Sequence, residues 1–181
     1  MMSKTLSLLL CLLCAPATAW AGDFTVHTTA APHGRLSADG YANSFGCAGA
    51  NISPDIVWNG APAATKSFLV TLYDHDAPSG SGWWHWLVAD IPATVTALPR
   101  GAGSGQAALP TGAVQFNTDL GQPGYLGACP PPGQIHRYTI TVKALTVAKL
   151  DVPPQATAAM VGFVSNMAAL AQATTSFTAQ R

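Results

Sequence analysis

The chain has 181 residues, of which 9% are charged and 49% are apolar, and its formal net charge is zero. This balance argues against nucleic-acid binding through a basic face and gives no electrostatic attraction to a membrane, while the apolar content indicates an ordered globular protein. A chain of this length is expected to form one domain. Because 17 glycines and 14 prolines separate short alternating segments, we expect many turns and a β-rich fold.

The first 21 residues have the features of a cleavable secretory leader. Lys4 supplies the positive start and residues 6–14 the apolar centre, while Ala19 and Ala21 of the Ala-Trp-Ala sequence place small side chains at the positions where signal peptidase requires them. The apolar run is too short for a spanning helix, and a lipoprotein signal at either of its cysteines is disfavoured because leucine precedes each. We therefore predict a signal peptide at residues 1–21, cleavage before Gly22, a single domain at residues 22–181 and a periplasmic or secreted location.

Two cysteines remain after that cleavage, Cys47 and Cys129. An even pair in an exported chain predicts one disulfide bond. The bond would close a loop of about 80 residues, for which the chain-entropy relation gives an upper-end stabilisation of about 4.5 kcal/mol. The alternative is a pair of buried free thiols.

In the first half of the predicted mature chain, residues 29–51 are rich in Gly, Ala, Ser and Asn and predict a loop. Ile56 and Trp58 share one face of an extended segment that follows this loop. The other strand signals are dense in β-branched and aromatic residues. The strands predicted from them cover residues 24–28, 66–73 and 85–91.

In the second half, residues 92–112 and 117–132 predict long irregular stretches around a short strand at residues 113–116. Residues 136–145 alternate clearly and predict a strand with one buried face. The residues expected on that face are His136, Tyr138, Ile140 and Val142.

The C-terminal segment changes period. After Pro153 and Pro154, apolar residues recur at helical spacing, so we predict one amphipathic helix from Gln155 to about Ala173. The apolar residues at that spacing are Met160, Phe163, Val164, Met167 and Leu170.

The densest cluster of functional side chains lies among three tryptophans and turns rich in Pro and Gly. Its members are Asp74, Asp76, His85, His136 and Tyr138. Ionisable groups in so much aromatic surface are costly to bury unless they are paired or bind something. Imidazoles and a tyrosine hydroxyl donate hydrogen bonds that suit a phosphate or carboxylate, and a nearby aspartate favours a charged imidazole. We therefore predict that the two segments meet and form a small pocket for an anionic group.

Structural roles compete with binding at these positions. A histidine on a strand is often a satisfied core or surface residue, and the Asp-x-Asp pattern before Ala-Pro can serve only to accept backbone N–H bonds at a strand end. Arg137 is the expected counterion of Asp76, on the side away from the pocket. We therefore expect Asp76 and Arg137 to be structural and Asp74 to be functional.

Metal binding and catalysis are the competing functions. Two histidines and a carboxylate can make an open metal site, but the close helical spacing of zinc hydrolases is missing. The chain has no Gly-x-Ser-x-Gly elbow and no Gly-rich phosphate loop before a helix, and the predicted disulfide takes both remaining cysteines. We predict no metal, no cofactor and no catalytic residue, with a hydrolase that uses Asp74 and His85 as the less favoured alternative.

Two separated motifs resemble the phosphatidylethanolamine-binding protein (PEBP) family. They are Asp74-His75-Asp76-Ala77-Pro78 followed by His85-Trp86, and Gly127-Ala128-Cys129-Pro130-Pro131-Pro132-Gly133 leading to His136-Arg137-Tyr138. Residues 51–54, 79–86 and 159–163 are also similar to its bacterial YbhB/YbcL-type branch, the Raf kinase inhibitor-like proteins. The similarity covers residues 44–181, and the leader and cysteine pair resemble the periplasmic YbcL-like members.

The resemblance implies a mainly β fold of two antiparallel sheets with a helix near the C-terminus and one small pocket for phosphate-like groups. Carried over by motif, the ligand-binding residues are Asp74, Ala77, Pro78, Trp83, His85, Gly127, Pro131, His136 and Tyr138. The family often has a cis peptide bond before the proline that matches Pro78. His75 and Ala128 stand where many members have proline, so we expect the rim of the pocket to differ. The family's C-terminal pocket contacts are not recognisable in residues 175–181.

The function predicted from this resemblance is that of a periplasmic binding protein for a phosphate-bearing or other small anionic ligand, such as a phospholipid head group. A small polar pocket accounts for a head group and not for acyl chains. The alternative is a secreted or periplasmic modulator of another protein, although kinase inhibition belongs to eukaryotic relatives. We expect no nucleic-acid partner and no transmembrane segment.

Overall fold

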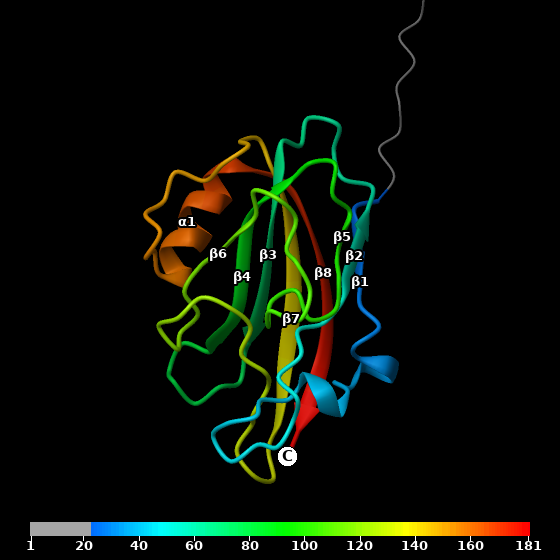
Figure 1. The fold of residues 1–181 in the computed structure, drawn as a ribbon, viewed down its shortest axis with the longest axis vertical. Helices are drawn as coiled ribbons and strands as arrows, with labels where there is room; N and C mark the ends of the chain where they lie inside the picture. Colours follow the sequence, from blue (N-terminus) through cyan, green and yellow to red (C-terminus); the bar gives the residue numbers. More distant parts are fainter. Residues whose placement is uncertain (1–22) are drawn as a thin grey trace, which may run out of the picture.

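The computed structural model describes residues 23–181, so the predicted signal peptide and its cleavage site lie outside the described residues. This part of the chain forms two antiparallel sheets and one α-helix (Figure 1). The three-stranded sheet has the order β1-β2-β5, and the five-stranded sheet has the order β6-β4-β3-β7-β8. The predicted mainly β fold of two antiparallel sheets with a helix near the C-terminus is confirmed.

The strands of the small sheet are β1 (Thr25–His27), β2 (Ile56–Asn59) and β5 (Ala97–Leu98). Those of the large sheet are β3 (Ser67–Asp74), β4 (Trp83–Pro92), β6 (Val114–Gln115), β7 (Ile135–Leu145) and β8 (Ala169–Gln180). The helices are α1 (Ala158–Ala168) and the short 3-10 helices η1 (Pro32–Gly34) and η2 (Ala38–Gly40). The sequence predicts only loop around β5, which is too short to leave a periodic signal. None of the helices in residues 23–181 combines the length and the apolar character needed to cross a bilayer.

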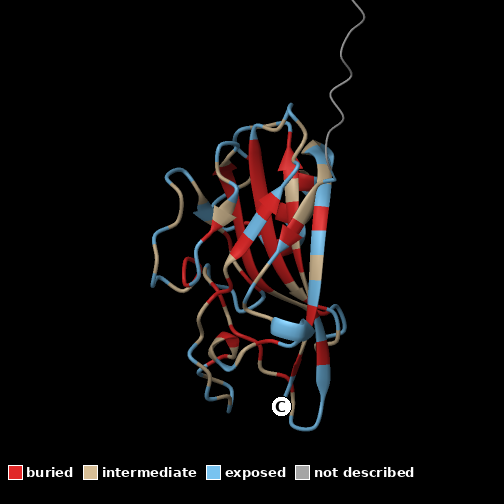
Figure 2. Cartoon of the chain, turned by 90° about the vertical axis from the view of Figure 1, so that its right-hand side faces the viewer, coloured by how far each residue is buried: buried red, intermediate tan, exposed pale blue. Residues whose placement is uncertain are grey.

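The large sheet is the middle layer of the molecule and is covered on both faces. Alternate residues of β3, such as Phe68 and Val70, join Trp58 of β2 in the core between the sheets. Leu69 points to the opposite face and joins Val161 of α1 in a second core. Because both of its faces are covered, the central strand β3 is buried almost throughout. Figure 2 shows the buried strands of the molecule in red.

Strand β7 has the predicted alternation. Residues from Arg137 to Lys143 alternate between one fully buried face and one partly or fully exposed face. The residues on the buried face are His136, Tyr138, Ile140 and Val142. This pattern places a histidine on the buried side of the strand at its very beginning.

The C-terminal segment differs from the helix predicted over residues 155–173. The Thr157 side chain caps the start of α1 by accepting the backbone N–H of Met160, and the helix ends at Ala168. The chain then continues directly into β8, which pairs with β7 along the whole length of that strand. Helical spacing is a local signal, whereas the hydrogen bonds to β7 and the burial of Phe177 exist only in the folded sheet.

Of the five residues in the predicted apolar stripe, only Val164 packs against the second core, so the stripe is a poor guide to the buried face of α1. The helix packs on the sheet through Ala158, Val161 and Ser165. Small side chains at these positions let the helix lie close to the sheet. The large apolar residues that face solvent instead are Met160, Phe163, Met167 and Leu170.

Candidate functional site

The predicted site residues converge at the end of the large sheet where β3 stops and β7 begins, which is the lower end in Figure 1. Asp74, the last residue of β3, lies opposite Trp83 of β4 on one side and Tyr138 of β7 on the other. His136 lies two residues before Tyr138 and therefore shares its face. Pairing of β3 with β7 thus brings together Asp74 and His136, which are 62 residues apart in the sequence.

A β-bulge in β4 sets the direction of His85. The partners of Leu72 and Tyr73 are Trp86 and Trp84, so His85 is the extra residue of the ladder. In a regular strand Trp84 and Trp86 would share a face. Here Trp86 belongs to the core between the sheets, while Trp84 packs on the opposite face. The bulge therefore accounts for the change of face at His85, a use of bulges that is common beside functional sites.

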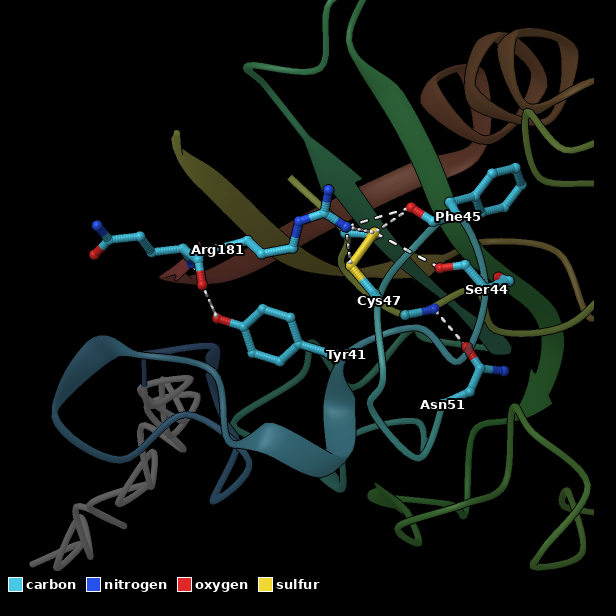
Figure 3. Close-up of a disulfide and its surroundings, with 9 residues drawn as sticks. Tyr41, Ser44, Phe45, Cys47, Asn51 and Arg181 are labelled. Atoms are coloured by element: carbon cyan, nitrogen blue, oxygen red, sulfur yellow. Dashed lines mark hydrogen bonds between the residues drawn. A yellow bond between two sulfur atoms is a disulfide. The ribbon is translucent and has the colours of Figure 1, made fainter. Parts of the chain in front are cut away.

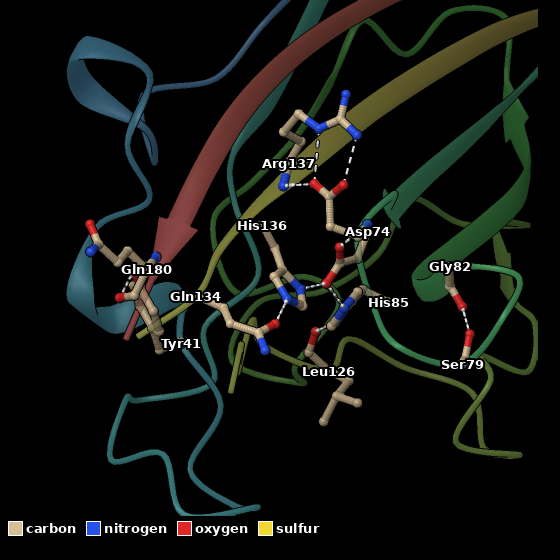
Figure 4. A network of polar contacts seen from close by, with 11 residues as sticks. Tyr41, Asp74, Ser79, Gly82, His85, Leu126, Gln134, His136, Arg137 and Gln180 are labelled. Atoms are coloured by element: carbon tan, nitrogen blue, oxygen red, sulfur yellow. Dashed lines mark hydrogen bonds and ion pairs between the residues drawn. The ribbon is translucent and has the colours of Figure 1, made fainter. Parts of the chain in front are cut away.

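The carboxylate of Asp74 is the central acceptor of the site (Figure 4). Its Oδ1 accepts the backbone N–H of Asp76 and its Oδ2 accepts Nδ1–H of His136, both at 2.8 Å. Nε2 of His85 lies 3.9 Å from the same Oδ2, and Nδ1 of His85 donates to the Leu126 carbonyl oxygen at 2.8 Å. Because a carboxylate and a carbonyl only accept, both Nδ1 atoms carry a proton. Nε2 of His85 is left for another partner, whereas Nε2 of His136 lies beside Gln134.

Asp74 stays ionised although it is buried. Burial by itself raises the pKa of Asp74, but the two imidazoles and the Asp76 backbone N–H outweigh it and hold the pKa well below its usual range. Burial, and after it the negative charge of Asp74, raises the pKa of Tyr138, so that phenol keeps its proton. The Tyr138 hydroxyl is buried and has no hydrogen-bond partner within residues 23–181. The site therefore contains one buried negative charge.

Asp76 and Arg137 form a separate pair outside the cavity. The Asp76 carboxylate accepts hydrogen bonds from Nε and Nη2 of Arg137 at 2.9 and 2.7 Å, and from the Arg137 backbone N–H at 2.8 Å. These bonds lower the pKa of Asp76 to about 2. The Arg137 side chain is 70% exposed, and neither residue lines the cavity. The pair thus ties the end of β3 to the start of β7.

A cavity of about 260 Å³ lies beside Asp74. Eight of the nine residues predicted to contact a ligand line it, namely Asp74, Ala77, Pro78, Trp83, His85, Gly127, Pro131 and His136. Tyr138 lies behind this wall, with its ring 5.3 Å from the His85 ring and stacked on Phe177 at 5.5 Å. The structure therefore gathers the predicted residues around one small cavity and gives Tyr138 a supporting position.

Four further residues at the site were not predicted from the sequence. Phe45, Leu126 and Cys129 complete the lining. Oε1 of Gln134 lies 3.1 Å from Nε2 of His136, a contact that is a hydrogen bond when Nε2 carries a proton. A signal for Phe45 existed, because the predicted disulfide joins its neighbour Cys47 to the Gly127–Pro131 motif. No comparable signal exists for Leu126, which acts through its backbone carbonyl, or for Gln134, which is an exposed amide.

The predicted disulfide between Cys47 and Cys129 is confirmed, with the two Cα atoms 5.9 Å apart (Figure 3). It joins the loop that contains Phe45 to the loop that forms one wall of the cavity. Nη1 of Arg181 lies 3.3 and 3.4 Å from the two sulfurs. The disulfide is therefore part of the architecture of the site.

The turn after β3 departs from the expectation of a cis bond. No peptide bond in the described residues is cis, so the bond before Pro78 is trans. The turn is made instead by a hydrogen bond from the Ser79 N–H to the Ala77 carbonyl at 2.8 Å and by Gly80, whose φ is +85°.

His75 lies outside the cavity, and its Nε2 lies 2.8 Å from Oγ1 of Thr139.

A metal ion is the other partner that two histidines and an aspartate could hold by residue type. The Nδ1 atoms of His85 and His136 are both engaged with protein oxygens. Over the range that the structure describes, no three His, Cys, Asp or Glu side chains are arranged to hold a metal ion.

Comparison with known proteins agrees with the fold and the motifs. A sequence model described as phosphatidylethanolamine-binding protein matches residues 26–180. The chain is 53% identical to UPF0098 protein YbhB of Escherichia coli (strain K12) over 131 residues, which is 72% of this chain and 83% of that protein. It is 49% identical to UPF0098 protein YbcL of the same organism over 141 residues, 77% of each chain.

The same relationship holds in three dimensions. The fold is similar to the crystal structure of E. coli YbcL, described as a new member of the mammalian PEBP family, with a TM-score of 0.83 and 44% sequence identity. That similarity covers 88% of this chain and 99% of the YbcL chain. Both the sequence and the fold therefore show that this chain belongs to the phosphatidylethanolamine-binding protein family.

Proposed function

We propose that the cavity binds a small anion, above all a phosphate-bearing group, and that the protein works as a binding protein. The observation that carries this proposal is the convergence of His85 and His136 on the buried carboxylate of Asp74 beside a small cavity. Each imidazole is oriented through its Nδ1 atom, so that a protonated Nε2 of His85 can donate to a ligand oxygen, and that of His136 can do so in exchange for its contact with Gln134. Membership of a family named for a phospholipid supports a phosphate-bearing ligand.

The buried charge of Asp74 sets a condition on this binding. An anion in the cavity is repelled by the carboxylate, because both charges lie in a region where little water screens them. Protonation of Nε2 on His85 or His136 adds a positive charge that offsets this repulsion and supplies a donor for the ligand. The proposed complex is therefore an anion, an imidazolium and a carboxylate, held together as one hydrogen-bonded network.

The first test is the substitution His136→Ala. We expect it to weaken the binding of inorganic phosphate at least tenfold, since a hydrogen bond to a charged group contributes about 1.5–3 kcal/mol. Isothermal calorimetry measures the affinity, and a thermal melt checks that the variant is folded. The matched control is His75→Ala, which removes a histidine that pairs with Thr139 outside the cavity and leaves phosphate affinity unchanged. A folded His136→Ala protein with wild-type affinity would contradict the proposal.

The second test follows from the charge of Asp74. We expect anion binding to be accompanied by uptake of about one proton, which goes to an imidazole Nε2. Sulfate is the suitable probe because it does not titrate between about pH 6 and pH 8, so that any proton taken up belongs to the protein. Calorimetry in buffers of different ionisation enthalpy measures the uptake. A binding enthalpy that is independent of the buffer would rule out the proposed charge balance.

We further propose that the mature protein works in the periplasm. The disulfide between Cys47 and Cys129 supports this location, because such bonds persist in oxidising compartments. The leader-like composition of residues 1–21 supports it independently.

A further inference from the structure

Phe45 is an exposed aromatic side chain held at the rim of the cavity. It lines the cavity although 65% of its surface is accessible to solvent. Its φ of +55° lies in the left-handed region, which is an outlier for a bulky residue and is retained only where the surroundings impose it. Such a conformation at the edge of a ligand cavity points to a role in binding.

The surroundings that impose this conformation are two loops joined to each other (Figure 3). The disulfide fixes Cys47, two residues after Phe45, to Cys129 in the cavity wall. Nη1 of Arg181 donates to the Phe45 carbonyl oxygen at 3.3 Å, and the Cys47 N–H donates to the Ser44 carbonyl at 2.9 Å. The backbone of Phe45 is therefore held by a turn within its own loop and by Arg181, and the disulfide joins this loop to the cavity wall.

Apart from Asp74, His85 and His136, which form its polar floor, the cavity is lined mainly by apolar side chains. Those that surround Asp74, His85 and His136 are Phe45, Ala77, Pro78, Trp83, Leu126 and Pro131. An oxyanion alone would use the polar groups and leave this apolar surface in contact with water. A cavity of about 150 Å³ holds a benzene ring, so about 260 Å³ leaves space for an anionic group and roughly one ring or short chain beside it.

We propose that Phe45 is a specificity-determining residue that packs against an apolar group bonded directly to the ligand's anionic group, and that the Cys47–Cys129 disulfide holds it in place for this contact. The preferred ligand class is then a phosphate ester with one compact apolar substituent, rather than free phosphate. This inference rests on the proposed anion binding at the same cavity. It adds recognition of the apolar part of the ligand, which the polar floor does not contact.

The test compares phenyl phosphate with inorganic phosphate by calorimetry. We expect the wild-type protein to bind phenyl phosphate about tenfold more tightly, because an aromatic contact adds to the burial of apolar surface. In Phe45→Ala this ratio of affinities should fall about fivefold, through a loss of affinity for phenyl phosphate. The matched control is Phe163→Ala, which removes an equally exposed phenylalanine, at 67%, from the outer face of α1 and should leave both affinities unchanged.

Each result bears on a different claim. If inorganic phosphate binds but phenyl phosphate gains nothing, or if Phe45→Ala leaves the ratio intact, the role of Phe45 is overturned and the anion site stands. If neither ligand binds the wild-type protein, the proposed function fails and this inference fails with it. Hexyl phosphate separates two sources of the apolar group: a larger Phe45-dependent gain for phenyl phosphate supports a free aryl ester, and a larger gain for hexyl phosphate supports a lipid-like ester.

The part played by the disulfide is tested with the same two ligands. In a Cys47→Ser, Cys129→Ser double variant, the loop with Phe45 is released while the histidines keep their positions on the sheet. We expect the preference for phenyl phosphate over inorganic phosphate to shrink as it does in Phe45→Ala. A folded double variant that keeps the full preference would show that Phe45 is positioned without the disulfide. Since Phe45→Ala alters only an exposed side chain, the main test holds even if the double variant fails to fold.

Discussion

Reduction of the Cys47–Cys129 disulfide is expected to lower the free energy of unfolding by as much as about 4.5 kcal/mol. The two cysteines are 82 residues apart, so the bond removes a large part of the conformational freedom of the unfolded chain. The same bond joins the Phe45 loop to the cavity wall, so its loss also frees contacts in the folded state. Urea unfolding of the oxidised and the reduced protein, followed by tryptophan fluorescence, measures the difference.

The control for this experiment is a Cys47→Ala, Cys129→Ala double variant. A reducing agent should leave its urea midpoint unchanged, because it has no disulfide to break. The variant should unfold at the midpoint of the reduced wild-type protein. Equal midpoints for oxidised and reduced wild-type protein would show that the bond contributes nothing to stability.

The substitution Gly127→Ala should destabilise the protein by about 3 kcal/mol, at the upper end for overpacking, because the added methyl group meets backbone that cannot move aside. A Cβ at this position would lie 2.5 Å from the Tyr41 carbonyl carbon and 2.7 Å from the Gly40 oxygen, and would also clash with the Ala42 nitrogen. These loops run side by side, with the Ala42 N–H bonded to the Ala128 carbonyl at 3.0 Å. Thermal and urea unfolding measure the loss.

Gly162→Ala is the matched control for Gly127→Ala. Gly162 lies inside α1, and a Cβ there would meet nothing within 4 Å. The same substitution should therefore raise stability by about 0.5–1 kcal/mol, since alanine favours a helix interior over glycine. If Gly127→Ala and Gly162→Ala changed the stability alike, close packing of the two loops at Gly127 would not explain the loss of stability in Gly127→Ala. Because Gly127 lines the cavity, its variant should also bind phosphate more weakly than wild type.

Much of the site was predictable because the relevant residue types are rare in this chain. The chain has few histidines and aspartates, and Asp74, His85 and His136 belong to motifs with a recognisable order and spacing. Because candidate partners are few, one sequence is enough to pair Asp76 with Arg137 and Cys47 with Cys129, although the partners lie 61 and 82 residues apart. The distances that join Asp74 to both histidines were not predictable, since they depend on how three strands pair.

The C-terminal segment shows the opposite case. Its apolar residues at helical spacing predicted a helix over residues 155–173, yet the chain from Ala169 onward forms the longest strand of the large sheet. Whether this segment forms a helix or a strand depends on residues elsewhere in the chain, because β8 is held by hydrogen bonds to β7. The exposed side chains of Met160 and Phe163 likewise reflect how closely α1 packs on the sheet, which periodicity does not report.

The alternation of β7, the disulfide pair and the polar groups of the site could be predicted without coordinates, because each follows from adjacent residues or from rare residue types. The bulge at His85, the place of Tyr138 behind the cavity wall and the place of Phe45 at the rim are properties of the folded chain. They could not be predicted, because register and loop position are set by contacts between segments far apart in the chain. A one-residue change in the pairing of β4 with β3 would place His85 on the other face of the sheet.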